Sequence, residues 1–169
     1  MSMRTGTTVI AGCIALVPRL LWSQTPAPPP APPKEIISFQ SATDVSAMIA
    51  KAEAARKTAG AAPIGGSTLL NLPPYTANLE YRTAPGNIAI HEKEAELFVV
   101  LDGSGTVVLG GKSVGEGAAK KVEGGTERKL AKGDIFIVPE NTVHWFNTIN
   151  NALVLMSMHV PRSPASTAQ

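Results

Sequence analysis

Hydrophobic and polar positions alternate with a period of two along most of the chain beyond Gly66. Short runs rich in apolar and β-branched residues recur between glycine, proline and asparagine, as expected for β-strands. The runs are STLLNL, YTANLEYR, NIAIH, AELFVVLD, GTVVLGG, TERKLA, DIFIVP, TVHWF and ALVLMSMHV. With turn signals at such short intervals and no helical segment between the runs, residues 67–160 predict one all-β unit, an antiparallel sandwich or barrel.

A helical period precedes the strands. Within the arm of residues 35–66, Thr43 or Asp44 is the candidate N-cap and Gly60 the candidate stop. Apolar residues follow at helical spacing, at Val45, Met48, Ile49 and Ala52. We therefore expect one amphipathic helix from Asp44 to about Thr58, packed on the outside of the barrel.

Two glycine-rich stretches interrupt the strand pattern. Residues 110–125 hold six glycines, which weaken regular structure and predict a long surface loop. The GSG at 103–105 predicts a hairpin turn. In AELFVVLD, Glu96 shares a face with Phe98 and Val100, and both faces of the run are apolar. We expect the opposite face to build the core, through Leu97, Val99, Leu101, Ile135 and Ile137.

The N-terminus has the layout of a secretory signal peptide. Arg4 precedes an apolar run from Val9 to Val17 that is too short to span a bilayer. We assign residues 1–24 to this signal, 25–34 to a proline-rich linker and 161–169 to a tail. The mature protein is then periplasmic or secreted. An alternative starts from Ile10 to Cys13, which resembles a lipoprotein signal box and would anchor the chain by lipidation of Cys13.

Charge and cysteine content narrow the partners. The chain has 15 Lys and Arg against 13 Asp and Glu, and without Arg4 and Arg19 of the signal the numbers are equal. No basic stripe is present, which argues against nucleic acid, and no cationic amphipathic helix or membrane span is predicted. Because Cys13 is the sole cysteine and lies in the signal, the mature domain has neither disulfide nor cysteine metal ligand.

Two segments carry candidate chemistry. In the first, His91 stands five residues before Glu96, and a buried carboxylate on an apolar strand needs a partner or a cation. In the second, KGDIFIVPENTVHWFN, a short buried strand lies between turns, and His144 opens the next strand. A strand, a bend and a return strand bring His91 opposite Glu96, and a histidine at the mouth of a barrel is a usual place for a ligand.

Together these segments resemble the paired motifs of the cupin superfamily. His91, Glu96 and Gly103 fit the first motif, and Gly133, Pro139 and His144 fit the second. The resemblance implies a small single-domain cupin, an all-β jelly-roll barrel, here with one N-terminal amphipathic helix. It further implies a frequent homodimer and an interior that in many members holds Mn, Fe, Zn or another divalent cation. Exposed edge strands that need cover also favour a homodimer.

The sequence departs from the family pattern where a ligand is expected. The usual earlier histidine of the first motif is Ala89, Asn141 replaces a glycine, and Thr148 stands where an asparagine is expected. His91, Glu96 and His144 still form a set of two imidazoles and one carboxylate that is able to hold a divalent metal. The alternative is a barrel that has lost its metal, with both histidines as satisfied polar groups.

Further residues are candidates for a ligand pocket. For Phe98 and Phe136 the first interpretation is a place in the core, and the second is the lining of a ligand pocket. His159, on the last strand, reads first as a packed or surface histidine and second as one that points into the barrel. Glu92 and Glu94 belong to a solvated loop, from which either is able to swing in and complete the site.

Three functions compete. The first is an exported, metal-dependent cupin enzyme acting on a small organic molecule. The second is a metal-free cupin that binds a small molecule, such as a sugar, without catalysis. The third, a structural domain, explains the proline linker but not the His and Glu cluster. Neither substrate nor reaction type follows from the residues.

Overall fold

The structure, a computed structural model, describes residues 35–161. The predicted signal (1–24), the linker (25–34) and the tail beyond Pro161 lie outside the described residues, so these assignments stay predictions. Within the described range no helix is long and apolar enough to cross a membrane.

Helix α1 (Ala42–Arg56) begins two residues earlier than predicted. Its N-cap is Ser41, not Thr43 or Asp44: the Ser41 hydroxyl accepts the Asp44 N–H at 3.1 Å, and the Asp44 carboxylate accepts the Ser41 N–H at 3.2 Å. This reciprocal capping box satisfies two of the N–H groups that a helix start leaves free. The predicted N-cap was wrong because Asp44 has the reciprocal role, three residues inside.

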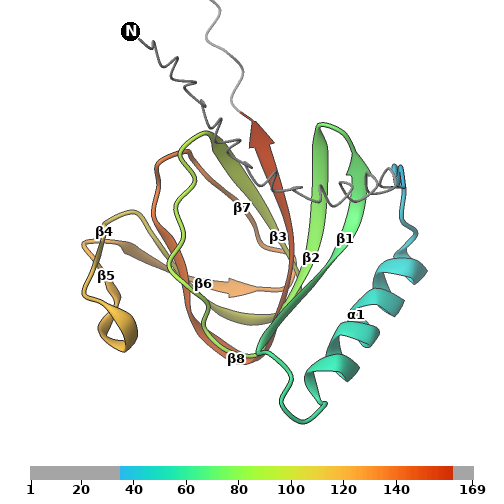
Figure 1. Cartoon of the computed structure of the whole chain (residues 1–169), viewed down its shortest axis with the longest axis horizontal. Helices are drawn as coiled ribbons and strands as arrows, with labels where there is room; N and C mark the ends of the chain where they lie inside the picture. The colour runs from blue at the N-terminus through green and yellow to red at the C-terminus, as the bar shows by residue number, and fades with distance from the viewer. Residues whose placement is uncertain (1–34, 162–169) are drawn as a thin grey trace, which may run out of the picture. The chain divides into compact units, whose positions relative to one another are not determined.

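The predicted apolar face of α1 packs against the outside of the sheet (Figure 1). Val45, Met48, Ile49 and Ala52 contact a buried cluster under the helix. That cluster comprises Leu69, Ala77, Leu79, Tyr81 and Val154. Tertiary packing of one apolar face is the main source of stability for a helix of this length. The helical spacing of these four apolar residues therefore determines which side of the helix docks on the sheet.

The rest of the described chain is mostly strand, and all its pairings are antiparallel. The strands are β1 (Ile64–Leu72), β2 (Tyr75–Arg82), β3 (Glu94–Leu109), β4 (Lys112–Val114), β5 (Lys121–Glu123), β6 (Thr126–Ala131), β7 (Ile135–Val138) and β8 (His144–Pro161). The main sheet has the order β1-β2-β8-β3-β6, and β7 pairs with the first half of β3. This bent sheet is the predicted all-β jelly roll with one N-terminal helix (Figure 1).

Strands β3 and β8 are long because each joins two predicted strands. The GSG at 103–105 lies inside β3, so the predicted hairpin turn was wrong. Gly103 has φ 78° at a register shift, and a Cβ there would lie 2.1 Å from the Ala152 carbonyl oxygen. A bulge at a glycine bends a strand, which allows the first half of β3 to pair with β7 and the second half with β6.

The barrel interior is lined by the face of β3 that carries Glu96, Phe98 and Val100, not by its opposite face. The interior cluster is Phe98, Val100, Val107, Leu130, Val138, Phe146, Leu153 and Leu155. The predicted core was therefore wrong: Leu97 and Val99 are half-buried, and Ile135 and Ile137 are 66% and 54% exposed. Of the five predicted core residues, Leu101 alone packs against the buried cluster under α1. Ile135 and Ile137 of β7 do not belong to that cluster.

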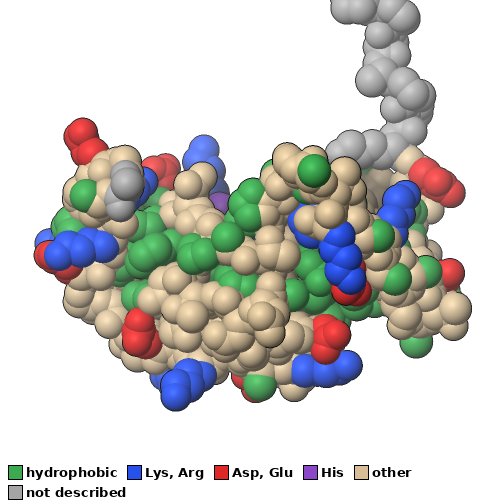
Figure 2. All heavy atoms as spheres, turned by 90° about the horizontal axis from the view of Figure 1, so that it is seen from below, with side chains coloured by type: hydrophobic (Ala, Val, Ile, Leu, Met, Phe, Trp, Pro, Cys, Tyr) green, Lys and Arg blue, Asp and Glu red, His purple; other side chains and the backbone are tan. Residues whose placement is uncertain are grey.

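Residues 110–125 are more regular than predicted. They form a hairpin of β4 and β5 with a short 3₁₀ turn at Gly117–Ala119, which projects from the side of the barrel away from α1 (Figure 1). On the face shown in Figure 2, described Lys and Arg side chains are mixed with Asp and Glu around an area of hydrophobic side chains. Charge on that face is thus not gathered into one positive area.

Candidate metal centre

Three short backbone contacts hold the His91 segment against the start of β8. Ala89 and His144 exchange both backbone hydrogen bonds, at 3.0 and 2.9 Å, and the Asn141 N–H donates to the His91 carbonyl at 2.8 Å. The predicted strand NIAIH is therefore reduced to one isolated bridge. That bridge is sufficient to place two residues from distant motifs side by side.

Glu96 enters the barrel from the start of β3. It pairs with Val138 of β7 on one side and with His159 of β8 on the other, and it is 4% exposed. The sequence alternation placed it correctly on the face of Phe98 and Val100, both buried. A carboxylate in such a position has lost most of its hydration and needs polar partners.

His144 is the first residue of β8 and follows a turn in which Asn141 has φ 56°. This left-handed conformation explains why glycine is usual there, and asparagine tolerates it better than most residues. The Nδ1 of His144 lies 3.4 Å from the Thr142 carbonyl oxygen. The Nε2 atom faces Glu96 and donates to it when it carries the proton; with the proton on Nδ1, the ring donates to Thr142 and Nε2 presents a lone pair to the barrel.

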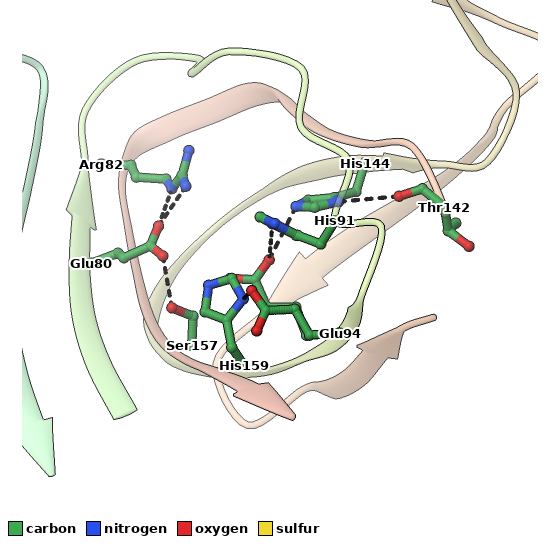
Figure 3. A network of polar contacts seen from close by, with 9 residues as sticks. Glu80, Arg82, His91, Glu94, Thr142, His144, Ser157 and His159 are labelled. Atoms are coloured by element: carbon green, nitrogen blue, oxygen red, sulfur yellow. Dashed lines mark hydrogen bonds and ion pairs between the residues drawn. The ribbon is translucent and has the colours of Figure 1, made fainter. Parts of the chain in front are cut away.

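The predicted trio meets at one carboxylate oxygen. The Nε2 atoms of His91 and His144 lie 3.1 and 3.2 Å from Oε2 of Glu96, and the two ring centroids are 5.3 Å apart (Figure 3). Among residues 35–161 no Lys or Arg forms an ion pair with this carboxylate. Three metal-ligand side chains therefore converge without a fixed cation.

His159 joins the same cluster, which the sequence did not favour. Its Nε2 lies 3.5 Å from Oε1 of Glu96, its Nδ1 lies 2.9 Å from Oε1 of Glu94, and its ring is 4.7 Å from that of His91. The contact with Glu94 is short, yet its direction is not that of a hydrogen bond, and His159 Nδ1 is a buried atom without a hydrogen-bond partner. His159 is thus neither a plain surface nor a plain core residue.

The electrostatics of Glu96 favour its ionised form. Burial alone raises the pKa of a carboxyl group. Here that effect is outweighed by the hydrogen bond from His144 and by the charges of His159, His144 and His91, so the pKa of Glu96 lies below its ordinary value. Near neutral pH the cluster therefore presents an anionic oxygen between imidazoles.

The two nitrogen-to-oxygen separations match those of donors around one ion, and all three donor atoms lie within 4.8 Å of one another. Two donors that each lie about 2.1 Å from an ion are about 3.0 Å apart at right angles and about 3.4 Å apart at the tetrahedral angle. The separations of 3.1 and 3.2 Å fall within that interval. Imidazole and carboxylate donors suit Mn, Fe and Zn, so the residues present fit a divalent transition metal. A second possible ligand group is His91, Glu94 and His159.

Aromatic side chains lie next to the cluster. Phe98 is buried, stacks on Phe136 with centroids 5.0 Å apart, and lies 5.9 Å from the His144 ring. Phe136 is half-buried and also lines a hollow of about 420 Å³ between β6 and β7, together with Val107 and Leu109. Of the two phenylalanines predicted for a ligand pocket, Phe136 lines this hollow, whereas Phe98 is buried beside the His144 ring.

Sequence reasoning missed a second polar group inside the barrel. Glu80 accepts hydrogen bonds from Arg82 Nε at 2.9 Å and from Ser157 at 2.8 Å (Figure 3). The Arg82 guanidinium lies 4.5 Å from the centre of the Phe146 ring. The alternation in YTANLEYR could have indicated it, because Glu80 and Arg82 alternate with the buried residues of β2.

The chain is thus a small jelly-roll protein in which histidines and a carboxylate that could hold a metal ion lie together. Residues 79–159, from β2 to β8, match the family model described as "Cupin domain". These residues form a single cupin domain, as the two sequence motifs predicted. No match was found among curated proteins.

Solved structures similar to the chain include further cupins. The cupin domain of Schizosaccharomyces pombe Cnp3 is 17% identical, with a TM-score of 0.48, over 60% of this chain and 66% of that one. KdgF from Halomonas sp. is 22% identical, with a TM-score of 0.45, over 62% and 87% of the two chains. A RmlC-like cupin from Shewanella frigidimarina is 17% identical, with a TM-score of 0.46, over 59% and 78%. Likeness at this level does not extend to function.

Proposed function

We propose that this cupin domain binds one divalent transition metal ion and uses it to bind, and act on, a small organic molecule. One observation carries the proposal: Glu96 is 4% exposed and ionised, two imidazole Nε2 atoms lie within 3.2 Å of one of its oxygens, and no Lys or Arg of the described chain pairs with it. A cation from solution would complete this site.

Each residue of the cluster would have a distinct role at a metal site. His91 and His144 would supply neutral ligands, and Glu96 would supply a ligand that offsets part of the metal charge. A bound divalent metal polarises an oxygen of its ligand or substrate as a Lewis acid. Phe136, half-buried and stacked on the buried Phe98, offers an apolar wall near the cluster, which suits a small organic molecule with a polar end toward the imidazoles.

A metal-free binding domain is the second candidate, and two observations favour it. Ala89 occupies the position where the family usually has another histidine. Distances of 3.1 and 3.2 Å are also those of hydrogen bonds, so imidazoles that donate from Nε2 would satisfy Glu96 without metal. In that case the barrel interior would bind a small molecule, such as a sugar, through polar side chains alone.

Metal content separates the two candidates. We would purify the protein without chelator, incubate it with Mn, Fe(II) and Zn in turn, remove free metal and measure bound metal by elemental analysis. We expect close to one equivalent in the wild type and a large loss in His144→Ala, with both proteins folded. Less than about a tenth of an equivalent of every metal in the wild type would favour the metal-free binder.

We also propose that the mature chain is exported and forms a homodimer. The N-terminal pattern supports export, and N-terminal sequencing of secreted material tests it: a start near Ser23 to Thr25 agrees, and an acylated Cys13 indicates the lipid anchor instead. An end strand, β1, supports the dimer, because only β2 and a single bridge from Ile37 cover it in the described chain. Light scattering measures the oligomeric state, and only monomer at high protein concentration would contradict the dimer.

A further inference from the structure

We propose that His159 is a fourth protein ligand of the same ion, through Nε2, and that Glu94 is its positioning residue. This inference rests on the proposed metal site and specifies its ligand set. The sequence motifs of the family did not include either residue in a ligand set. The structure brings both to the cluster from the paired ends of β3 and β8.

Strand register fixes His159 beside Glu96. The two residues are direct partners in the β3–β8 pairing, and residues opposite each other on antiparallel strands project to the same face. The imidazole therefore enters the barrel with the carboxylate. His159 Nε2 lies 3.5 Å from Oε1, whereas His91 and His144 approach Oε2. The donor atoms of His159 group within 4.8 Å with those of His91 and Glu94, not with the complete first trio, so the His159 side chain would move toward His144 when the ion binds.

Glu94 selects the nitrogen that faces the metal. Its Oε1 lies 2.9 Å from Nδ1 of His159, and that nitrogen is a buried atom with no hydrogen-bond partner. Glu94 is half-exposed, so a rotation of its carboxylate would complete a hydrogen bond from Nδ1. An imidazole whose Nδ1–H donates to a carboxylate has its lone pair on Nε2, toward Glu96, and is a stronger metal ligand.

His159 thereby compensates for Ala89. With three imidazoles and one carboxylate, the protein offers as many ligands as the usual motif, although one of them comes from the last strand. A six-coordinate ion held by four protein ligands keeps two positions for water or a small molecule. The same four ligands would enclose an ion with tetrahedral preference more fully.

Copper(II), added alone to metal-free protein, is the probe, because it binds imidazole sites tightly and its electron paramagnetic resonance spectrum reports coordinated nitrogens. We would measure affinity by competition with a chelator, together with that spectrum. For His159→Ala we expect about 100-fold weaker binding and a nitrogen pattern that falls from three imidazoles to two. For Glu94→Gln we expect about 10-fold weaker binding with three nitrogens retained. The matched control, Glu116→Gln, alters an exposed carboxylate of the β4–β5 hairpin and should match the wild type.

A rescue variant guards against a fold defect in His159→Ala. Residue 89 is bridged to His144, so a side chain there projects to the same face. Adding Ala89→His to His159→Ala should therefore restore a third nitrogen and most of the affinity. Unchanged affinity and spectrum in His159→Ala would overturn the role of His159 and leave the three-ligand site standing. A wild type that binds neither copper nor the other metals would overturn both proposals.

Discussion

Two carboxylates enter the barrel interior from different strands, and their surroundings differ in one respect. Glu80 on β2 has a fixed cation, Arg82, and a hydroxyl donor, Ser157. Glu96 on β3 has three imidazoles around it and no fixed cation in the described chain. Histidine, unlike arginine, is not a permanent cation, so an imidazole does not replace a guanidinium as a fixed partner. The first cluster is complete as it stands, whereas the second is arranged for a cation from outside.

The difference separates a structural network from a binding site. A buried ion pair with all its hydrogen bonds made fixes side-chain geometry and has no need of a further partner. A buried carboxylate between imidazoles keeps similar donor separations with or without metal, because hydrogen bonds and metal bonds place the donor atoms at similar distances. Substitutions in the Glu80 cluster should therefore destabilise the fold, whereas substitutions in the Glu96 cluster should mainly remove metal binding.

Removal of the fixed cation should have the largest effect. Arg82→Ala leaves Glu80 largely buried without its partner and removes the packing on Phe146. We expect the free energy of unfolding to fall by about 3 kcal/mol in chemical denaturation. The matched control is Lys132→Ala, which breaks an exposed pair with Asp102 and should cost less than about 0.5 kcal/mol. Equal losses in the two variants would refute a special role for Arg82.

Metal should stabilise the wild type by a slightly smaller amount. An ion at 100 times its dissociation constant raises the free energy of unfolding by about 2.7 kcal/mol. We expect this shift in thermal unfolding of the wild type and none in Glu96→Gln, which removes the anionic ligand. Metal-free Glu96→Gln should itself remain within about 1 kcal/mol of the wild type, because no fixed cation depends on Glu96. A loss as large as that of Arg82→Ala would mean that the two clusters do not differ as described.

An added ligand should sharpen the contrast further. Ala89 is bridged to His144, so Ala89→His would direct another imidazole to the face that carries the cluster. We expect metal affinity to rise by about tenfold, or about 1.4 kcal/mol, in chelator competition. Ala89→Gln, similar in length but without an imidazole, is the control for added bulk. A gain in both variants would point to packing and not to coordination.

Acid should reveal the Glu96 cluster in metal-free protein. Since the pKa of Glu96 lies below its ordinary value of 4.5 in the folded protein, the unfolded chain binds more protons between those two pKa values. The resulting stabilisation is present above pH 4.5 and is lost as pH falls through the folded pKa. In chelator-treated samples, the difference in unfolding free energy between wild type and Glu96→Gln should therefore change in that window. A difference that stays constant from pH 7 downward would argue against the lowered pKa.

The fold class and three residues of the candidate site could be predicted from the sequence. Period-two runs and the paired motifs predicted a jelly roll and brought His91, Glu96 and His144 together, because these residues follow short turns whose chemistry is local. The helix face at Val45 and Met48 was predicted for the same reason. Local spacing is what the sequence states most directly.

What the sequence did not predict depends on register and on which face is inside. The position of His159 follows from strand pairing across several register shifts in β3 and β8, which no local pattern specifies. The apolar character of Ile135 and Ile137 predicted core positions, but the barrel interior is on the other face of the sheet and both side chains are exposed. Gly103 read as a turn, and its left-handed backbone instead accommodates a bulge inside a strand.

Diffraction from crystals of the metal-free protein soaked in Mn²⁺ or Zn²⁺ tests the central claim most directly. An anomalous-difference map would locate the ion independently of any activity. We predict one strong peak about 2.0 to 2.2 Å from Nε2 of His91, Nε2 of His144 and a carboxylate oxygen of Glu96. A map with no peak at this cluster, or with peaks only at surface carboxylates, would contradict the proposal that these residues form a metal centre.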